Sequence, residues 1–219
     1  MTVYLILEYN QNDSNRVSCN HQKPPLGKSC KVSLDAFHPC TKKENYQFDK
    51  GMPCVFLKLN KIFNWQPEFY EDNESLPKNM PVQLKSHIGE QILKKINPST
   101  VWVSCEGENP ADVEHLGTEI TYHSTNQMQG FPGNFFPFVN TKGYLQPLVA
   151  VEFNSITSKF IFKLSYKISN NKQSFMKISG GVLINIECKA WAKNIKHDRA
   201  DRRGSVHFEL MIDSSTTNV

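Results

Sequence analysis

The sequence predicts a mainly β protein: an antiparallel β-sandwich with one amphipathic helix, stapled by disulfides. Three observations support this prediction. Several short apolar runs have the composition or alternation of strands, one stretch has a helical period, and the cysteines number six, an even count. A chain of 219 residues has room for one large domain with a proper core.

The predicted strands lie mostly in the C-terminal half. Residues 205–212 alternate between polar and apolar, so that one face carries Val206, Phe208, Leu210 and Ile212. Four shorter runs rich in β-branched residues predict buried strands. They are residues 55–59, 101–105, 148–153 and 182–188.

One stretch repeats with a helical period instead. Between Pro81 and Pro98, apolar residues recur every four positions, at Leu84, Ile88, Ile92 and Ile96. The polar segment before it, Asn64 to Met80, contains two internal prolines, and we expect a surface loop there.

Composition excludes several classes of protein. The net charge is 25 − 21 = +4, too small and too dispersed for a nucleic-acid binder. A hydrophobic share of 39% with 21% charged residues does not fit collagen-like, disordered or coiled-coil chains. The apolar run at residues 3–7 is far shorter than the roughly 20 residues that span a bilayer, and it lacks the features of a signal peptide.

The six cysteines have no C-x-x-C spacing, which zinc ribbons and thioredoxin-like motifs require. Six cysteines allow 15 pairings, and sequence alone does not choose among them. The simplest proposal is sequential pairing, with roughly 3 kcal/mol for each short loop and about 4.5 for the long one. It joins Cys19 to Cys30, Cys40 to Cys54, and Cys105 to Cys188. Six buried free thiols in a cytosolic protein are the alternative.

Two glycosylation sequons, at Asn12 and Asn73, favour an extracellular or lumenal domain when they are taken together with the cysteines. The chain as written carries no targeting segment that would bring it to such a compartment. We therefore expect that an N-terminal targeting portion is missing.

No catalytic or metal-binding motif stands out. The seven histidines form no H-E-x-x-H, and G-x-S-x-G, P-loop and G-x-G-x-x-G motifs are missing from the sequence. Cys105 with His115 or His123 is a conceivable nucleophile pair, but a bridged sulfur cannot attack a substrate. We predict no catalytic residue, no metal ligand and no cofactor.

The most conspicuous segment is aromatic. Residues 130–138 carry four phenylalanines among prolines and glycines, which forbid a regular helix or a central strand. The rings either plug the edge of the core or form an exposed anchor for a protein partner. Composition alone favours the first interpretation.

This segment and residues 143–153, Gly-Tyr-Leu-Gln-Pro-Leu-Val-Ala-Val-Glu-Phe, resemble the signature of Na,K-ATPase β subunits. Further stretches resemble the same family in the same order: residues 51–62, 103–107, 186–190 and 201–213. The resemblance covers roughly residues 15–213, whereas residues 1–14 match poorly.

The resemblance implies a non-catalytic subunit that stabilises the catalytic α subunit of a Na,K pump, escorts it to the plasma membrane and modulates K⁺ transport. It implies an Ig-like extracellular domain over residues 15–219, sequential disulfides, and a transmembrane helix that this chain lacks. The family's aromatic loop faces the α subunit, which reverses the preference stated above. The partner-binding candidates are Phe135, Phe136, Pro137, Phe138, Tyr144, Gln146 and Pro147.

Two departures from the family pattern stand out. Phenylalanines occupy positions of the aromatic motif where many members carry tyrosines. Between Phe153 and Ile186 the chain has 32 residues (154–185), more than the usual strand pair needs. We expect an insertion around residues 157–181, either a retained intron or an extra hairpin turning at Asn170 and Asn171.

Two functional questions stay open at the level of sequence. One is whether the partner is a Na,K or an H,K pump. The other is whether the chain is instead an adhesion or carbohydrate-binding domain without a pump partner.

Overall fold

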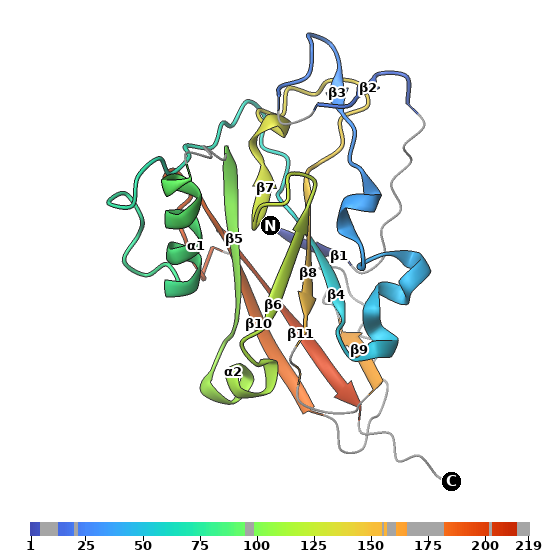
Figure 1. The fold of residues 1–219 in the computed structure, drawn as a ribbon, viewed down its shortest axis with the longest axis vertical. Helices are drawn as coiled ribbons and strands as arrows, with labels where there is room; N and C mark the ends of the chain where they lie inside the picture. Colours follow the sequence, from blue (N-terminus) through green and yellow to red (C-terminus); the bar gives the residue numbers. More distant parts are fainter. Residues whose placement is uncertain are drawn as a thin grey trace.

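The computed structural model describes residues 1–4, 13–19, 22–94, 99–154, 156, 161–165, 182–201 and 203–213. In these residues two antiparallel sheets pack face to face around a shared core (Figure 1). The predicted mainly β, sandwich-like architecture is confirmed. Among the described residues, no helix has the length and the apolar character needed to cross a bilayer.

The smaller sheet has the strand order β1-β4-β8-β6. Its strands are β1 (Thr2–Tyr4), β4 (Cys54–Lys58), β8 (Leu148–Phe153) and β6 (Ile120–Ser124). The larger sheet has the order β7-β5-β10-β11-β9. Its strands are β7 (Gly130–Pro132), β5 (Thr100–Gly107), β10 (Val182–Trp191), β11 (Ser205–Asp213) and β9 (Ile161–Ser165).

Strand β8 explains why its sequence is an apolar run rather than an alternation. All six of its residues are buried. Val149, Val151 and Phe153 belong to the core between the sheets, while Leu148 and Ala150 belong to a second cluster on the opposite face. Both faces of the smaller sheet are therefore covered, so the strand is apolar except for Glu152, which is buried and hydrogen bonded to His123.

Helix α1 (Val82–Leu93) covers the outer face of the larger sheet. Leu84 and Ile88, from its predicted apolar stripe, pack with Trp102 of β5 and Trp191 of β10. These two tryptophans are direct cross-strand partners, so they form one apolar platform for the helix. The helix ends at Leu93, and the last expected stripe residue, Ile96, is outside the described residues.

The outer face of the smaller sheet is covered by irregular chain, which we call the loop layer (residues 30–53). It contains the 3₁₀ helices η1 (Leu34–Phe37) and η2 (Lys42–Lys50). Phe37 and Tyr46 meet Phe56 of β4 edge-on, with ring centroids 5.6 and 5.9 Å apart. In Figure 1 this layer and α1 lie on opposite sides of the sheets.

All six cysteines are bridged, in the sequential pattern. Cys105 and Cys188 are cross-strand partners on β5 and β10 and lie in the core. The other two bridges, Cys19–Cys30 and Cys40–Cys54, tie the loop layer to its surroundings. Cys30 belongs to β3 (Ser29–Cys30), which pairs in parallel with β2 (Arg16–Val17).

Several elements were not predicted: the strands β6 and β7 and the short helix α2 (Pro110–Leu116). Asn109 caps α2 by accepting a hydrogen bond from the backbone nitrogen of Asp112. Residues 2–4 pair with β4 at the sheet edge. Of the expected insertion, only residues 161–165 are described, and their backbone pairs with β11; the turn expected at Asn170 lies outside the described residues.

Candidate partner-binding surface

Two glycines bring the aromatic segment onto the edge of the larger sheet. Strand β7 pairs with the start of β5, and a Cβ atom on Gly130 would collide with the carbonyl oxygen of Val101. A Cβ on Gly133 would collide in the same way with the carbonyl oxygen of Ser99. Only glycine permits this close approach, which places the following turn, η3 (Gly133–Phe135), at one end of the sandwich.

Three rings of the segment point into the protein. Phe131 is fully buried, and Phe135 and Phe136 are 5% and 7% exposed. Phe136 meets Trp65 edge-on, with the ring centroids 5.5 Å apart, and Phe135 packs with the loop layer. These rings fix the conformation of the turn, because each one is held by the core on which it packs.

The next rings are only half-buried. Phe138 and Tyr144 pack against each other with centroids 4.9 Å apart, and the ammonium group of Lys61 lies 5.3 and 5.8 Å from the two centroids. Burial raises the pKa of Tyr144 from its ordinary value of 10.0 to about 12. Phe138 and Tyr144 therefore form a packed aromatic pair, with the ammonium group of Lys61 above the rings.

A second chain segment lies beside this aromatic pair. The backbone nitrogen of Asn64 donates to the carbonyl oxygen of Phe138 at 2.8 Å, and Phe63 forms a parallel bridge with Phe138. This pairing places three exposed apolar side chains beside the rings: Ile62, Phe63 and Val139, which are 56%, 70% and 48% exposed. We call Ile62, Phe63, Pro137, Phe138, Val139 and Tyr144 the aromatic surface.

Gln146 and Pro147 are held by the protein rather than presented to solvent. The side-chain amide of Gln146 donates to the carbonyl oxygen of Leu59, at the end of β4, and Pro147 is buried. Of the seven predicted partner-binding residues, the structure thus brings Pro137, Phe138 and Tyr144 to the surface. Phe135, Phe136 and Pro147 are buried, and Gln146 is partly buried.

A pocket of about 180 Å³ opens next to the aromatic surface, between residues 23–30 and 134–144. The pocket is smaller than the roughly 300–1,000 Å³ of a small-molecule site, and suits one or two side chains of a partner. Leu26 on its rim is fully exposed. Its lining includes Lys23, Lys28, Phe136, Pro137, Val139 and Tyr144.

The conceivable nucleophile pair is not brought together as a reactive thiol. Cys105 is bridged to Cys188, and its backbone nitrogen donates to the hydroxyl of Tyr122 at 2.8 Å. His115 is exposed on α2. His123 is hydrogen bonded to Glu152, with His123 Nε2 and Glu152 Oε2 2.9 Å apart. With its sulfur in a bridge, Cys105 has no thiol to attack a substrate.

Of the two predicted glycosylation sites, the structure describes only Asn73. Asn73 is exposed, in a turn where Ser75 donates to the carbonyl oxygen of Asp72. Its side-chain amide lies close to Gly89 of α1. Asn12 lies outside the described residues.

Comparison with known proteins decides the family. A family profile described as "Sodium / potassium ATPase beta chain" matches residues 6–174. This chain belongs to the sodium/potassium ATPase β-chain family. The family is one of non-catalytic accessory subunits, which confirms the prediction that the chain is not itself an enzyme.

Three curated β subunits illustrate the similarity. Subunit beta-2 of the sodium/potassium-transporting ATPase of Drosophila melanogaster is 45% identical over 91% of this chain and 54% of its own length. Subunit beta-1 of the same fly is 40% identical, over 84% and 50%. A probable subunit beta-3 of Caenorhabditis briggsae is 31% identical, over 94% and 51%. The chain spans about half the length of the curated β subunits it matches.

Sequence reasoning missed half of the aromatic surface in this β chain. Ile62 and Phe63 are two adjacent apolar residues in a mostly polar stretch that follows the end of β4. This isolated apolar pair was the available signal. Their proximity to Phe138 could not be predicted, since it depends on a bridge between distant segments.

Proposed function

We propose that this chain is the α-binding extracellular part of a β subunit. It assembles with the catalytic α subunit of a sodium/potassium pump, stabilises that subunit, accompanies it to the plasma membrane and modulates K⁺ transport. Membership of the β-chain family supports this proposal. The single structural observation that supports it best is the aromatic surface, where exposed apolar side chains gather on a rigid base.

The aromatic surface has the properties of a docking site. Ile62, Phe63 and Val139 together expose apolar area that association with a partner would remove from water. The buried rings below hold the turn in place, so little conformational freedom remains to be lost on binding. The lysines around it, Lys23, Lys28 and Lys61, favour a partner loop that carries acidic groups.

The effect on K⁺ transport follows from differential binding. A bound subunit changes the K⁺ equilibrium of a pump only if it prefers one pump conformation over another. A domain that docks on the extracellular loops of the α subunit can do this without touching an ion. The aromatic surface is then the point where the β chain senses the conformation of its partner.

The proposed topology places residues 15–219 outside the cell, behind a transmembrane helix that precedes them in the full-length subunit. Glycans on Asn12 and Asn73 belong to that topology. For Asn73, exposure of the residue in a turn supports the assignment. The excess residues around 157–181 form an insertion between β8 and β10 in this proposal.

Affinity capture of a co-expressed sodium/potassium pump α subunit tests the proposal. The variant Val139→Asp places a charge in the aromatic surface, and Val82→Asp places the same charge on the exposed start of α1. We expect Val139→Asp to reduce captured α subunit at least about tenfold, and Val82→Asp to leave it unchanged. Failure of the unmodified chain to capture α subunit, or an equal loss in both variants, would contradict the proposal.

A further inference from the structure

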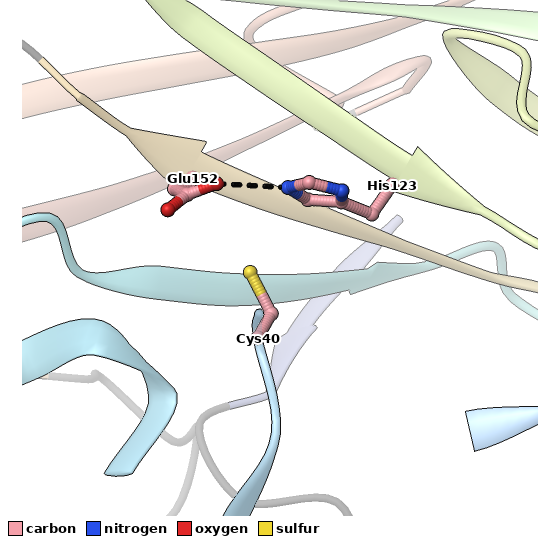
Figure 2. Close-up of side chains that lie close together, drawn as sticks. All are labelled: Cys40, His123 and Glu152. Carbon is pink, nitrogen blue, oxygen red and sulfur yellow. Dashed lines mark hydrogen bonds and ion pairs between the residues drawn. The ribbon is translucent and has the colours of Figure 1, made fainter. Parts of the chain in front are cut away.

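A cluster of three ligand-type side chains lies on the outer face of the smaller sheet. Cys40 Sγ, His123 Nε2 and a carboxylate oxygen of Glu152 all lie within 4.8 Å of one another (Figure 2). Cys40 is 1% exposed and Glu152 is 6% exposed, so the cluster is largely buried beneath the loop layer. The proposed docking with a pump makes no use of these groups.

Strand register explains how the cluster forms. On the central strand β8, Glu152 lies opposite Cys54 of β4. The next residue of β8 on the same face, Ala150, lies opposite His123 of β6. The Cys40–Cys54 disulfide holds the Cys40 sulfur next to the side chains of Glu152 and His123. Three adjacent strands and one cross-link thus bring the groups together.

We propose that opening the Cys40–Cys54 disulfide creates a zinc site formed by Cys40, His123 and Glu152. A disulfide sulfur carries no charge and binds Zn²⁺ poorly, whereas a thiolate is among its preferred ligands. Imidazole and carboxylate complete a set of three protein ligands, and a water molecule takes the fourth tetrahedral position. The bridge and the metal therefore exclude each other.

The spacing of the three groups suits this ion. Tetrahedral zinc with bonds of roughly 2.0–2.3 Å places its ligand atoms about 3.3–3.6 Å apart. His123 Nε2 and Glu152 Oε2 are now 2.9 Å apart, and no pair in the cluster exceeds 4.8 Å. Side-chain shifts on the order of an ångström convert this arrangement into a coordination sphere. The His123 side chain is 17% exposed and gives a path from solvent.

The chemistry balances with a dithiol as reductant. The dithiol loses two electrons and two protons and becomes a disulfide, while the sulfurs of Cys40 and Cys54 gain them and become thiols. Zn²⁺ then replaces the thiol proton of Cys40, which passes to solvent. Once held by zinc, the Cys40 sulfur is no longer available to re-form the bridge with Cys54. Zinc therefore retards closure of this one disulfide.

Two matched variants of the full chain test the site. Cys54→Ser frees the Cys40 thiol, and Cys40→Ser frees the Cys54 thiol, so that both lose the same cross-link but only the first keeps the proposed ligand. We expect Cys54→Ser to bind one Zn²⁺ at least about 100-fold more tightly than Cys40→Ser does, measured in competition with a chelating dye. With Co²⁺ in place of zinc, Cys54→Ser should give a thiolate-to-metal charge-transfer band. Adding His123→Ala or Glu152→Gln to Cys54→Ser weakens zinc binding at least about tenfold.

A second measurement uses the unmodified chain and does not depend on how the variants fold. A phosphine and water reduce the disulfides to thiols, the phosphine becoming its oxide, under conditions in which zinc-free alkylation of both Cys40 and Cys54 shows that this buried bridge has opened. Alkylated cysteines are mapped by mass spectrometry. We expect Zn²⁺ to protect Cys40 from alkylation and to leave Cys54 reactive. Equal zinc affinity of the two serine variants would overturn the proposal. So would equal alkylation of Cys40 with and without zinc.

Discussion

The two outer faces of the sandwich are covered in different ways. Helix α1 covers the larger sheet, and its side chains pack on Trp102 and Trp191 with no disulfide between helix and sheet. The loop layer covers the smaller sheet with short 3₁₀ turns, and two of the three disulfides secure it. The partner surface and the proposed zinc site both adjoin the irregular side.

Backbone hydrogen bonding accounts for this difference. An α-helix satisfies its own backbone groups, so one apolar stripe is enough to dock it. Irregular chain has few such bonds and a larger conformational entropy to lose, and cross-links reduce that loss by restricting the unfolded chain. In return, irregular chain can present side chains in arrangements that a helix does not permit. The face that needed cross-links is thus the face that carries candidate functional groups.

The largest expected effect is on the helical face, which depends on packing alone. Ile88 of α1 is fully buried, and Ile88→Ala is expected to lower the free energy of unfolding by about 2–5 kcal/mol in denaturant titrations. Leu93→Ala, at a position that is 80% exposed on the same helix, is the control, with an expected change within about 0.5 kcal/mol. Similar losses in both variants would mean that α1 is not held by its stripe.

Removal of the Cys40–Cys54 bridge is the matching test of the loop layer. The double variant Cys40→Ala, Cys54→Ala is expected to lower the free energy of unfolding by about 3 kcal/mol. Hydrogen exchange should accelerate in residues 34–50 and stay unchanged in α1. Equal acceleration on both faces would show that the cross-link stabilises the whole sandwich and would remove the contrast.

A smaller effect is expected where the aromatic surface meets the core. Trp65→Leu removes the edge-on contact with Phe136. It should lower the free energy of unfolding by about 0.5–1.5 kcal/mol more than the smaller buried apolar area accounts for. The double variant with Phe136→Leu isolates the pair energy in a mutant cycle. Additive losses would mean that the two rings do not support each other.

The smallest expected effect is a pH dependence on the helical face. His87 of α1 lies edge-on to Trp102 at 5.6 Å, and burial lowers its pKa below the ordinary value. His87 therefore binds a proton more readily in the unfolded chain than in the folded one. Its contribution to the free energy of unfolding is fully present above about pH 6.5 and is lost as the pH drops through the folded pKa. His87→Gln should flatten part of this decline in thermal melts. His197, whose pKa is also lowered by burial, accounts for a remaining part.

How far the fold could be predicted depended on the local signal of each element. Strands β8 and β11 and the helix α1 were foreseen because their apolar residues have a clear composition or period. Strand β6 was not foreseen, since Ile120–Ser124 has a single aliphatic residue and reads as a polar segment. It is a strand only because β8 offers it a partner edge. Ile120, Thr121 and Tyr122 favour strands, but the run is short and weakly apolar, and tertiary pairing decided that element.

The same division applies to the candidate sites. The aromatic segment was visible in the sequence, but its partners Ile62 and Phe63 arrive through a bridge to Phe138. Prediction found no metal ligand, because Cys40 and Glu152 come from segments that only the sheet register joins. Contacts of this kind are properties of the folded chain and leave no spacing motif.

Docking of this β chain on a pump through the aromatic surface can be measured by hydrogen exchange of the chain free and bound to a sodium/potassium pump α subunit. We expect slower exchange on binding in residues 23–30, 61–65 and 134–146, with unchanged exchange in residues 82–93 of α1. Protection of α1 with no change around Phe138 and Tyr144 would contradict it.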